Sequence, residues 1–465
     1  MICSRTLPFT NNQGPRKPAF QSKSLKVTIM SRNWGTTIYA LLDQDGPFAT
    51  ADTPPGISIF SPLSRRRVSE LRRKNLVTKY RATRNQIFEL LNVNSYADIQ
   101  LLIKDRERRR EADRRAYLLL GNMFGIHGSE REIISRVNSY SQTADSVIRY
   151  LNNKVLSRYS PFIEITNEID IASSPVDLLL IMFNNRYHKK ARFEAKRKLV
   201  LMSLAGSIDQ RERETDIETK FAEFLHFLNR YVWSPDIKIG ELKLFYLLSH
   251  HEPQNFSCRD VKVLSEAEAA KITPQPGQKL TLIKRRRFRT GKKELPIYVS
   301  VRKKPPEAKV LKLIRKGEEN PAVAVDDELG LLGVLDTAAE VKQFQKHLTE
   351  SAIRAKSFMT LEDISDTLDG GSSHTSSNIG SSASTPMMKF FARMGGMRVE
   401  FIVHNNKSYL DYIYKKDVSH DEYEVKRIFD SGVADLLFPK EIYHLDMTTA
   451  RNELIRWFRQ RIENY

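Results

Sequence analysis

The sequence is poor in cysteine: Cys3 and Cys258 are the only two among 465 residues, and there is no C-x-x-C motif. This scarcity excludes a disulfide scaffold and a thiolate zinc site, and it indicates a reducing compartment. Long apolar stretches are also absent. The longest run, Leu178 to Phe183, has six residues, whereas a helix needs about 20 to span a bilayer. We therefore expect neither a disulfide-rich secreted protein nor an integral membrane protein.

Several familiar catalytic motifs are missing as well. The chain has no G-x-x-x-x-G-K-[ST], no G-x-G-x-x-G after a strand, no H-E-x-x-H and no G-x-S-x-G. Its ten histidines are scattered, and no pair has metal-ligand spacing with acidic support. Nothing near Cys258 in the sequence would lower the pKa of its thiol, so we interpret this cysteine as structural.

Composition divides the chain into three parts. Residues 1–62 form a basic segment and linker that we expect to be disordered, and the first 29 residues contain no acid, as in a transit peptide. Residues 63–255 have helical periodicity and predict an α-helical domain, with a clear amphipathic helix over 209–232. Residues 256–465 alternate β-rich runs with helical patterns and predict a mixed-sheet α/β domain. The expected fold class is α+β, with the helical domain first.

Within the second domain, the pattern predicts specific elements. Strands are expected over 280–288, 296–301, 322–325, 331–335, 389–394 and 397–404, and helices over 306–316, 337–357 and 409–429. An insert at 364–386, in which 14 of 23 residues are Ser, Gly or Thr, predicts a mobile segment. Such an insert is either an active-site loop or a surface excursion.

Positive charge is concentrated in one region. The chain holds 75 Lys and Arg against 56 Asp and Glu, a formal charge of +19. Between Lys284 and Lys316 there are fourteen basic residues against Glu294 and Glu307, which makes +12 in 33 residues. A field this concentrated attracts polyanions such as nucleotide phosphates, RNA or anionic lipid. The alternative is a solvated charge run without a ligand.

Part of this region has the layout of a phosphate cradle. Arg302 and Lys304 are expected at the end of a strand, and Lys312 in the second turn of the helix that follows. The N–H groups of a helix N-terminus would point in the same direction, and together with these cations they suit a triphosphate. A solvated basic face on an ordinary helix is the alternative.

Two carboxylates further along the chain could complete such a site. Asp327, after Asp326 and ahead of Gly330, is expected beside a strand edge, where a carboxylate near phosphates suits Mg²⁺. Glu400 lies in an otherwise apolar strand, where it must meet solvent, a cation or a metal. An acidic turn without a ligand and a pair with Arg398 are the respective alternatives. Two carboxylates with a basic clamp are the minimum for Mg²⁺-assisted phosphoryl or pyrophosphoryl transfer.

In order and spacing, these segments resemble the motifs of RelA/SpoT-type (p)ppGpp synthetases. Residues 302–312 (RKKPPEAKVLK) resemble R-x-K-x-x-x-S-x-x-x-K, residues 327–330 resemble the start of D-x-x-G-x-R, and residues 399–404 (VEFIVH) resemble V-E-[VI]-Q-I-[RH]. The resemblance covers about residues 280–430. It implies a nucleotidyltransferase fold, a mixed sheet flanked by helices, and transfer of pyrophosphate from ATP to the 3′-hydroxyl of GDP or GTP.

The resemblance also implies a role for each matching residue. Arg302, Lys304 and Lys312 would hold the ATP phosphates, Asp327 would bind Mg²⁺, and Glu400 would bind the metal or activate the hydroxyl. The sequence departs from the family pattern in three places: Leu332 stands where the family has Arg, Ile402 stands where it has Gln, and no G-Y-x-S element, whose Tyr stacks on the acceptor guanine, is found. No His-Asp metal set of the family's hydrolase domain is visible upstream.

Three hypotheses follow. The first is a divergent, Mg²⁺-dependent nucleotide pyrophosphotransferase or nucleotidyltransferase, with ATP as donor and a guanine nucleotide as acceptor. The second is a catalytically degenerate nucleotide-binding or regulatory domain of the same fold. The third is an RNA-binding protein that uses the basic patch 284–316. We expect a cytoplasmic protein, while targeting by residues 1–29, the role of the helical half and the oligomeric state stay open.

Overall fold

The protein is described here from a computed structural model. The structure describes residues 37–42, 66, 69, 76–234, 243–325, 327–357, 359–368, 373–374, 385–394 and 396–464. Helices fill the first part of the described chain, and a mixed sheet follows, so the predicted α+β class is confirmed. Most of segment 1–62 and most of the insert 364–386 lie outside the described residues. Among the described helices, none has both the length and the apolar character that crossing a bilayer requires.

The described chain before the sheet is almost entirely helical. Its elements are α2 (Leu76–Leu91), α3 (Tyr96–Lys104), α4 (Arg106–Met123), α5 (Glu130–Tyr150), η3 (Leu151–Val155), η4 (Ser157–Tyr159), α6 (Ser160–Ile163), α7 (Asn167–Asp170), α8 (Pro175–Phe183), α9 (Lys189–Thr215), α10 (Ile217–Phe227) and η5 (Leu228–Val232), after the short helix η2 (Ile38–Leu41). Capping residues determine where several of these helices begin. A capping box of Ser129 and Glu132 begins α5, and Ser174 caps α8, which has Pro175 in its first turn.

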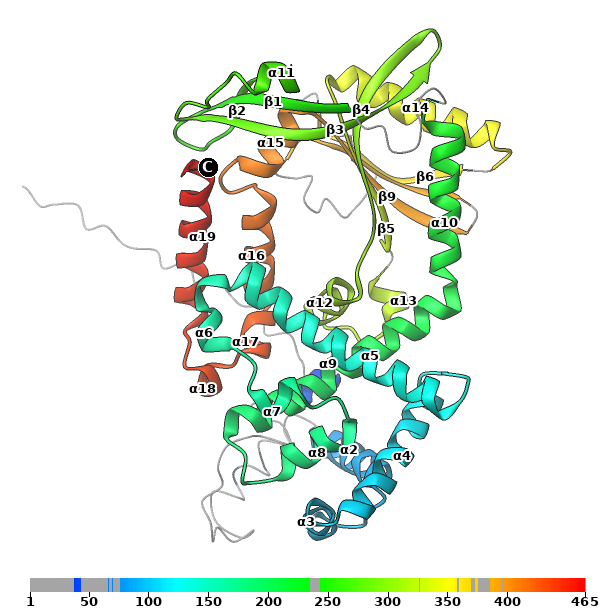
Figure 1. The fold of residues 1–465 in the computed structure, drawn as a ribbon, viewed down its shortest axis with the longest axis vertical. Helices are drawn as coiled ribbons and strands as arrows, with labels where there is room; N and C mark the ends of the chain where they lie inside the picture. Colours follow the sequence, from blue (N-terminus) through cyan, green and yellow to red (C-terminus); the bar gives the residue numbers. More distant parts are fainter. Residues whose placement is uncertain are drawn as a thin grey trace, which may run out of the picture.

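The second part of the described chain contains the strands and five helices of nine or more residues, with four shorter ones. Its elements are β1 (Lys243–His251), β2 (Cys258–Ser265), α11 (Glu266–Ala269), β3 (Gln278–Thr290), β4 (Lys293–Lys303), α12 (Pro306–Lys316), α13 (Pro321–Ala324), β5 (Leu329–Leu335), α14 (Ala338–Arg354), β6 (Met359–Asp366), β7 (Ser373–His374), β8 (Met388–Met394), β9 (Met397–Asn405), α15 (Asn406–Tyr414), α16 (His420–Asp430), α17 (Val433–Leu437), α18 (Lys440–Tyr443) and α19 (Met447–Asn464). Figure 1 shows the sheet at one end of an elongated molecule and α2, α3 and α4 at the other.

The described strands form one mixed sheet. Its order is β2-β1-β3-β4-β5-β9-β8-β6-β7, and the pairing is antiparallel except between β5 and β9, which are parallel. One face of the central strands is apolar and packs against α10 and α14. Phe224 and Phe344 from these helices share a core with Leu331 and Phe401 from the strands. The parallel contact between β5 and β9 is what places two segments about seventy residues apart side by side.

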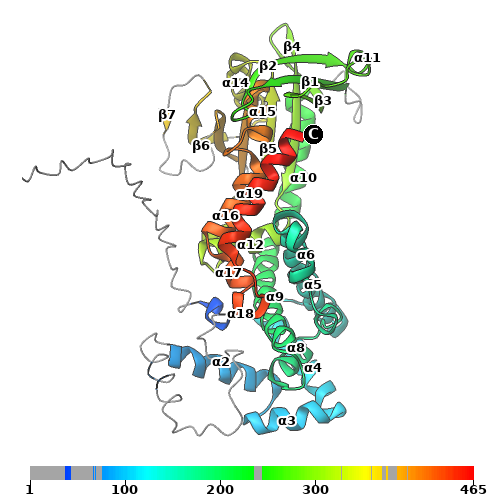
Figure 2. The same ribbon diagram turned by 90° about the vertical axis from the view of Figure 1, so that its left-hand side faces the viewer.

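The helical core draws on both ends of the chain. Side chains of α5 and α9 pack in one cluster with α12 and with the C-terminal helices α16 to α19. Tyr39 also lies in this cluster, fully buried, and its hydroxyl donates to the Glu318 carbonyl oxygen at 2.7 Å. Figure 2 shows α12 and α16 between the sheet and α9, where the two parts of the molecule meet. The described helices at both chain ends therefore stabilise each other through α12.

Several predicted elements need correction. The helical region expected up to residue 255 ends at Val232, and strand β1 already begins at Lys243. The helix predicted over 209–232 is divided by Asp216, whose left-handed φ of 49° separates α9 from α10. The strand predicted over 322–325 is the short helix α13, because Asn320 caps it and a proline occupies its first turn. The helix predicted over 409–429 is two helices, α15 and α16.

Candidate polyphosphate site

Strand β4 and helix α12 place the predicted cations at one end of the sheet. After β4 ends, the Lys304 N–H donates to the Glu328 carbonyl oxygen at 2.8 Å, which ties this turn to the residues before β5. Two prolines, 305 and 306, then start α12, and Gly317 with a φ of 67° ends it. The predicted helix 306–316 is thus confirmed, and Lys312 lies in its second turn.

Asp327 lies between two lysines. The Lys304 Nζ donates to its Oδ2 at 2.6 Å, and the Lys312 Nζ donates to its Oδ1 at 2.6 Å. All three side chains are at most 16% exposed. Burial raises the pKa of Asp327, but the charges and hydrogen bonds of the two lysines outweigh it and hold this pKa well below its ordinary value. Asp327 is therefore ionised at every physiological pH.

Glu400 lies on β9, two strands across the sheet from Arg302 of β4. Arg302, Gly330 and Glu400 are direct neighbours on β4, β5 and β9, so the two charged side chains lie on the same face. The Arg302 Nη2 lies 3.5 Å from Glu400 Oε2, and the Lys389 Nζ of β8 lies 3.0 Å from Oε1. The intervening glycine leaves room for this contact, because a Cβ at residue 330 would lie 3.3 Å from the Arg302 Nε.

The two carboxylates belong to one electrostatic site. Burial lowers the pKa of Lys304, and the charges of both Asp327 and Glu400 act in the opposite direction on it. The structure therefore brings the five predicted residues into two ion-pair groups that act on each other electrostatically: Asp327 with Lys304 and Lys312, and Glu400 with Arg302. With Lys389, four positive charges face two negative ones. We call these six residues the polyphosphate cluster.

Helix α16 faces this cluster from the helical half. His420, Glu424 and Arg427 recur at helical spacing, so they lie on one side of α16. Burial lowers the pKa of His420, and the charges of Glu424 and Arg302 also act on its ring. The ring of Tyr412, on α15, lies 5.2 Å from that of His420. Aromatic and charged groups of α15 and α16 thus border the cluster.

Sequence reasoning missed Lys389 and the inner side of α16. Lys389 lies in a predicted strand, but only the pairing of β8 with β9 shows that its side chain reaches Glu400. The α16 residues follow Glu400 of β9 by at least twenty positions, with helix α15 between them. A helical-wheel reading of 420–430 would have shown that His420, Glu424 and Arg427 share a face, although not what they face.

A resident metal site is not built into the described residues. They contain no group of three or more His, Cys, Asp or Glu side chains that could hold a metal ion. Both carboxylate oxygens of Asp327 accept from lysine, and both oxygens of Glu400 lie beside a cation. These two carboxylates fit Mg²⁺ only if incoming phosphates draw the cations away, since Mg²⁺ sites usually combine one or two carboxylates with substrate phosphates.

The basic patch 284–316 is divided among several roles. Arg285 is buried and pairs with Asp336 at 2.8 Å. Lys309 is fully buried and donates to Glu212 of α9 and to Glu328. Much of the positive charge that the sequence shows as one run therefore stabilises the fold or belongs to the cluster, while Lys284 and Arg289 are exposed.

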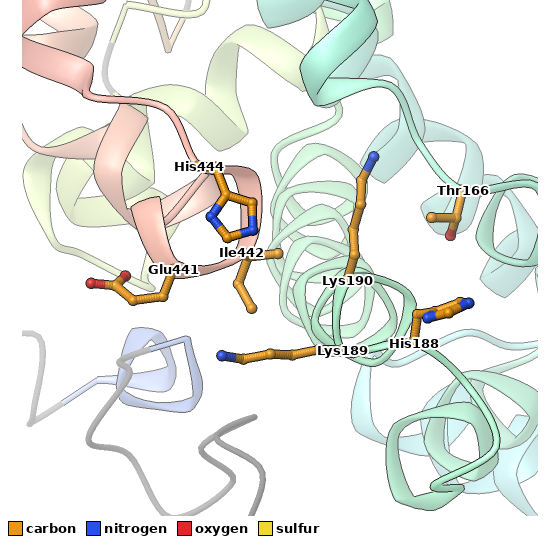
Figure 3. A pocket seen from close by; sticks show the side chains of 7 residues that line it. All are labelled: Thr166, His188, Lys189, Lys190, Glu441, Ile442 and His444. Atoms are coloured by element: carbon orange, nitrogen blue, oxygen red, sulfur yellow. The ribbon is translucent and has the colours of Figure 1, made fainter.

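A separate cavity of about 380 Å³ lies at the start of α9 (Figure 3). Its lining comprises Thr166, His188, Lys189, Lys190, Glu441, Ile442 and His444, none of which was predicted as a site residue. In Figure 3 the Lys189 and Glu441 side chains extend to one side and His188 to the other, so these groups do not converge on one point.

Cys258 is buried, and burial raises the pKa of its thiol to about 12. This environment agrees with the interpretation of a structural thiol, because the reactive form is the thiolate.

Comparison with known proteins adds no relative. No family model, no curated protein and no solved structure matches the chain.

Proposed function

We propose that the polyphosphate cluster binds the phosphates of a nucleoside triphosphate and that the protein is a divergent, Mg²⁺-dependent nucleotide pyrophosphotransferase or nucleotidyltransferase. The observation that carries the proposal is the pair of hydrogen bonds that Lys304 and Lys312 donate to the Asp327 carboxylate. Two poorly exposed ammonium groups are held 2.6 Å from one anion, in a cluster with an excess of positive charge. A phosphate chain presents the same kind of acceptor, with more charge and more oxygens.

Binding in this proposal is an exchange of partners. Phosphate oxygens take the place of Asp327 on Lys304 and Lys312, and a second group of phosphate oxygens takes the place of Glu400 on Arg302. The two released carboxylates can then contact the Mg²⁺ that enters with the nucleotide as part of the substrate. That ion would neutralise charge on the phosphates during transfer. The cations and the carboxylates of the chain orient the phosphate chain between them.

The acceptor in this proposal follows from the RelA/SpoT resemblance. A hydroxyl group of the acceptor, the 3′-hydroxyl of a guanine nucleotide in that family, would attack the β-phosphorus of ATP. A new O–P bond would form there while the bond from this phosphorus to the α,β-bridging oxygen breaks, so that pyrophosphate is transferred and AMP leaves. Glu400, once released from Arg302 and Lys389, is the carboxylate in the cluster that could accept the hydroxyl proton. Its position on the central strand β9, between Val399 and Phe401 of the packed core, fixes it firmly.

A second candidate is a domain that binds a nucleotide without turnover. Two observations favour it: Leu332 and Ile402 replace polar residues of the motif, and each carboxylate is fully occupied by cations. Binding can occur in such a cluster even if the carboxylates never reach a metal. ATP or a guanine nucleotide would then serve as a regulatory ligand for the helical half.

One assay separates the two candidates. The purified protein is incubated with Mg²⁺, ATP and a panel of nucleotide acceptors, and ATP consumption and products are followed by chromatography. The transferase proposal predicts a product that requires an acceptor, and at least a hundredfold slower formation in Glu400→Gln. The matched control is Glu252→Gln, which removes a surface partner of Arg259 and should leave the rate unchanged.

Each negative result has a defined meaning. If ATP is not consumed but calorimetry shows binding that Lys312→Gln weakens, the protein is a nucleotide-binding domain. If neither ATP consumption nor binding is detected, both candidates are refuted. Equal rates for Glu400→Gln and the unmodified protein would refute the transferase proposal alone, because the activity would then arise elsewhere.

A further inference from the structure

The three central strands β4, β5 and β9 align their residues in rows beside the polyphosphate cluster. One row contains the charged pair of the cluster: Arg302, Gly330 and Glu400. Two positions further along each strand, on the same face, lies a row without charge: Ser300, Leu332 and Ile402. We call these three residues the middle row. Residues two positions apart on a strand are about 6.6 Å apart, so the middle row directly adjoins the charged row.

The middle row is partly open to solvent. Ser300 is exposed, and Leu332 and Ile402 are partly exposed. The opposite face of β9 differs, because Val399 and Phe401 are buried there in the core beneath α10 and α14. Leu332 and Ile402 therefore place apolar surface on the face of the sheet that carries the charges, not in the core.

Aromatic side chains border the middle row on the side away from the charges. The next row along the strands consists of larger residues: Tyr298, Val334 and His404. Helix α15 covers this row, since the ring of Tyr409 lies 5.8 Å from that of Tyr298. The ring of Tyr412 lies between two imidazoles, 5.3 Å from His404 and 5.2 Å from His420. Leu332 packs against the same apolar cluster as Tyr412. The middle row thus has a charged border and an aromatic border.

We infer that the middle row holds the nucleoside of the nucleotide whose phosphates bind the polyphosphate cluster, with the base lying on Leu332 and Ile402. This inference rests on the proposed function, which places only the phosphates. A nucleobase is a flat ring that packs on apolar and aromatic surface, and the Ser300 hydroxyl can donate or accept a hydrogen bond. Lys304, Arg302 and Ser300 follow one another at two-residue steps, in the order in which phosphates and nucleoside follow one another in a nucleoside triphosphate.

The middle row would make the site selective for nucleotides over inorganic polyphosphate. Because the row has no charge, a longer phosphate chain gains no ion pair there, whereas an uncharged base gains apolar contact. The same row contains Leu332 and Ile402, the two residues that depart from the RelA/SpoT motifs. In this inference their apolar character serves the binding of the nucleoside.

Calorimetric titration of the full chain with ATP and with tripolyphosphate, both without metal, tests the inference. In Leu332→Gln and in Ile402→Gln the affinity for ATP should fall about fivefold or more. The affinity for tripolyphosphate should stay within about twofold, because both variants keep every charge of the cluster. The matched control is Leu282→Gln on β3, which replaces a leucine that is 47% exposed and lies outside the middle row. It should bind both ligands as the unmodified protein does.

The outcomes separate this inference from the proposed function. If ATP binds in a manner that depends on Lys312 but its affinity changes less than about twofold in both middle-row variants, the inference is overturned and the proposed function stands. Equal losses for ATP and tripolyphosphate also overturn it, because the variants would then act on the phosphates. If neither ligand binds the unmodified protein, the inference and the proposed function fail together. Thermal unfolding of each variant confirms that it is folded.

Discussion

Asp327→Asn is the substitution that tests the lysine clamp most sharply. It keeps the shape of the side chain and removes the anion between Lys304 and Lys312, whose side chains are 15% and 8% exposed. Removing one partner of a buried charge pair costs about 3–5 kcal/mol, because the remaining charges are left uncompensated. We take about 3 kcal/mol as the expected loss in the free energy of unfolding, since a small part of each side chain still reaches water.

A phosphate chain should recover part of this loss. A ligand that binds only the folded state at 100 times its Kd adds about 2.7 kcal/mol. In the variant the lysines no longer have Asp327 as an internal competitor, so metal-free tripolyphosphate should bind it more tightly than it binds the unmodified protein. The stability gap between the two proteins should therefore narrow as tripolyphosphate is added.

Equilibrium unfolding in urea, with and without tripolyphosphate, measures both effects. The control is Asp170→Asn, because Asp170 pairs with Arg149 at 3.0 Å where both side chains are at least half exposed. A surface pair of this kind is worth about 0–1 kcal/mol. The lysine clamp is refuted if Asp327→Asn lowers the free energy of unfolding no more than this control does. It is also refuted if tripolyphosphate leaves the difference in unfolding free energy between variant and unmodified protein unchanged.

Three further predictions follow from single residues. Lys309→Met leaves its two glutamate partners unpaired in the interior, and urea unfolding should show a loss of about 3–5 kcal/mol; a loss below 1 kcal/mol would contradict this. Gly330→Ala should push the Arg302 side chain away from the Glu400 carboxylate and weaken tripolyphosphate binding several-fold in calorimetry, with little loss of stability. An unchanged affinity would contradict the placement of Arg302 in the binding site. Burial lowers the pKa of His404 from 6.5 to about 4, so the unfolded state takes up its proton first. The free energy of unfolding should be highest above pH 6.5 and fall by about 3 kcal/mol toward pH 4. His404→Gln should reduce this dependence on pH, and an equal pH dependence in both proteins would refute the role given to the buried His404.

Much of the fold was predictable because local signals agree with tertiary packing. The helix over 306–316 has prolines at its start, glycine at its end and an apolar stripe, and it forms as expected. Strand β9 was predicted from its apolar run, and its pairing buries that run. The strand expected over 322–325 failed because apolar composition alone does not separate a short strand from one helical turn. No local sequence pattern predicts that the C-terminal helices pack in one core with the first helical half.

The candidate site was predictable in its residues but not in its pairing. The sequence order of Arg302, Lys304, Asp327 and Glu400 indicated one site. The β4–β5–β9 register places Arg302 beside Glu400, and Lys304 pairs with Asp327 just beyond the ends of β4 and β5. What the sequence could not indicate is that each carboxylate is neutralised by cations from a different element. Lys389 reaches Glu400 only because β8 pairs with β9, a contact set by the topology of the sheet.

The most direct test of the central claim is a crystal structure with Mg²⁺ and a non-hydrolysable ATP analogue. We predict phosphate oxygens within hydrogen-bonding distance, about 2.7–2.9 Å, of the Nζ atoms of Lys304 and Lys312. Asp327 should then have left both lysines and turned toward the metal. A triphosphate bound elsewhere on the protein, with the Asp327 ion pairs intact, would contradict the account.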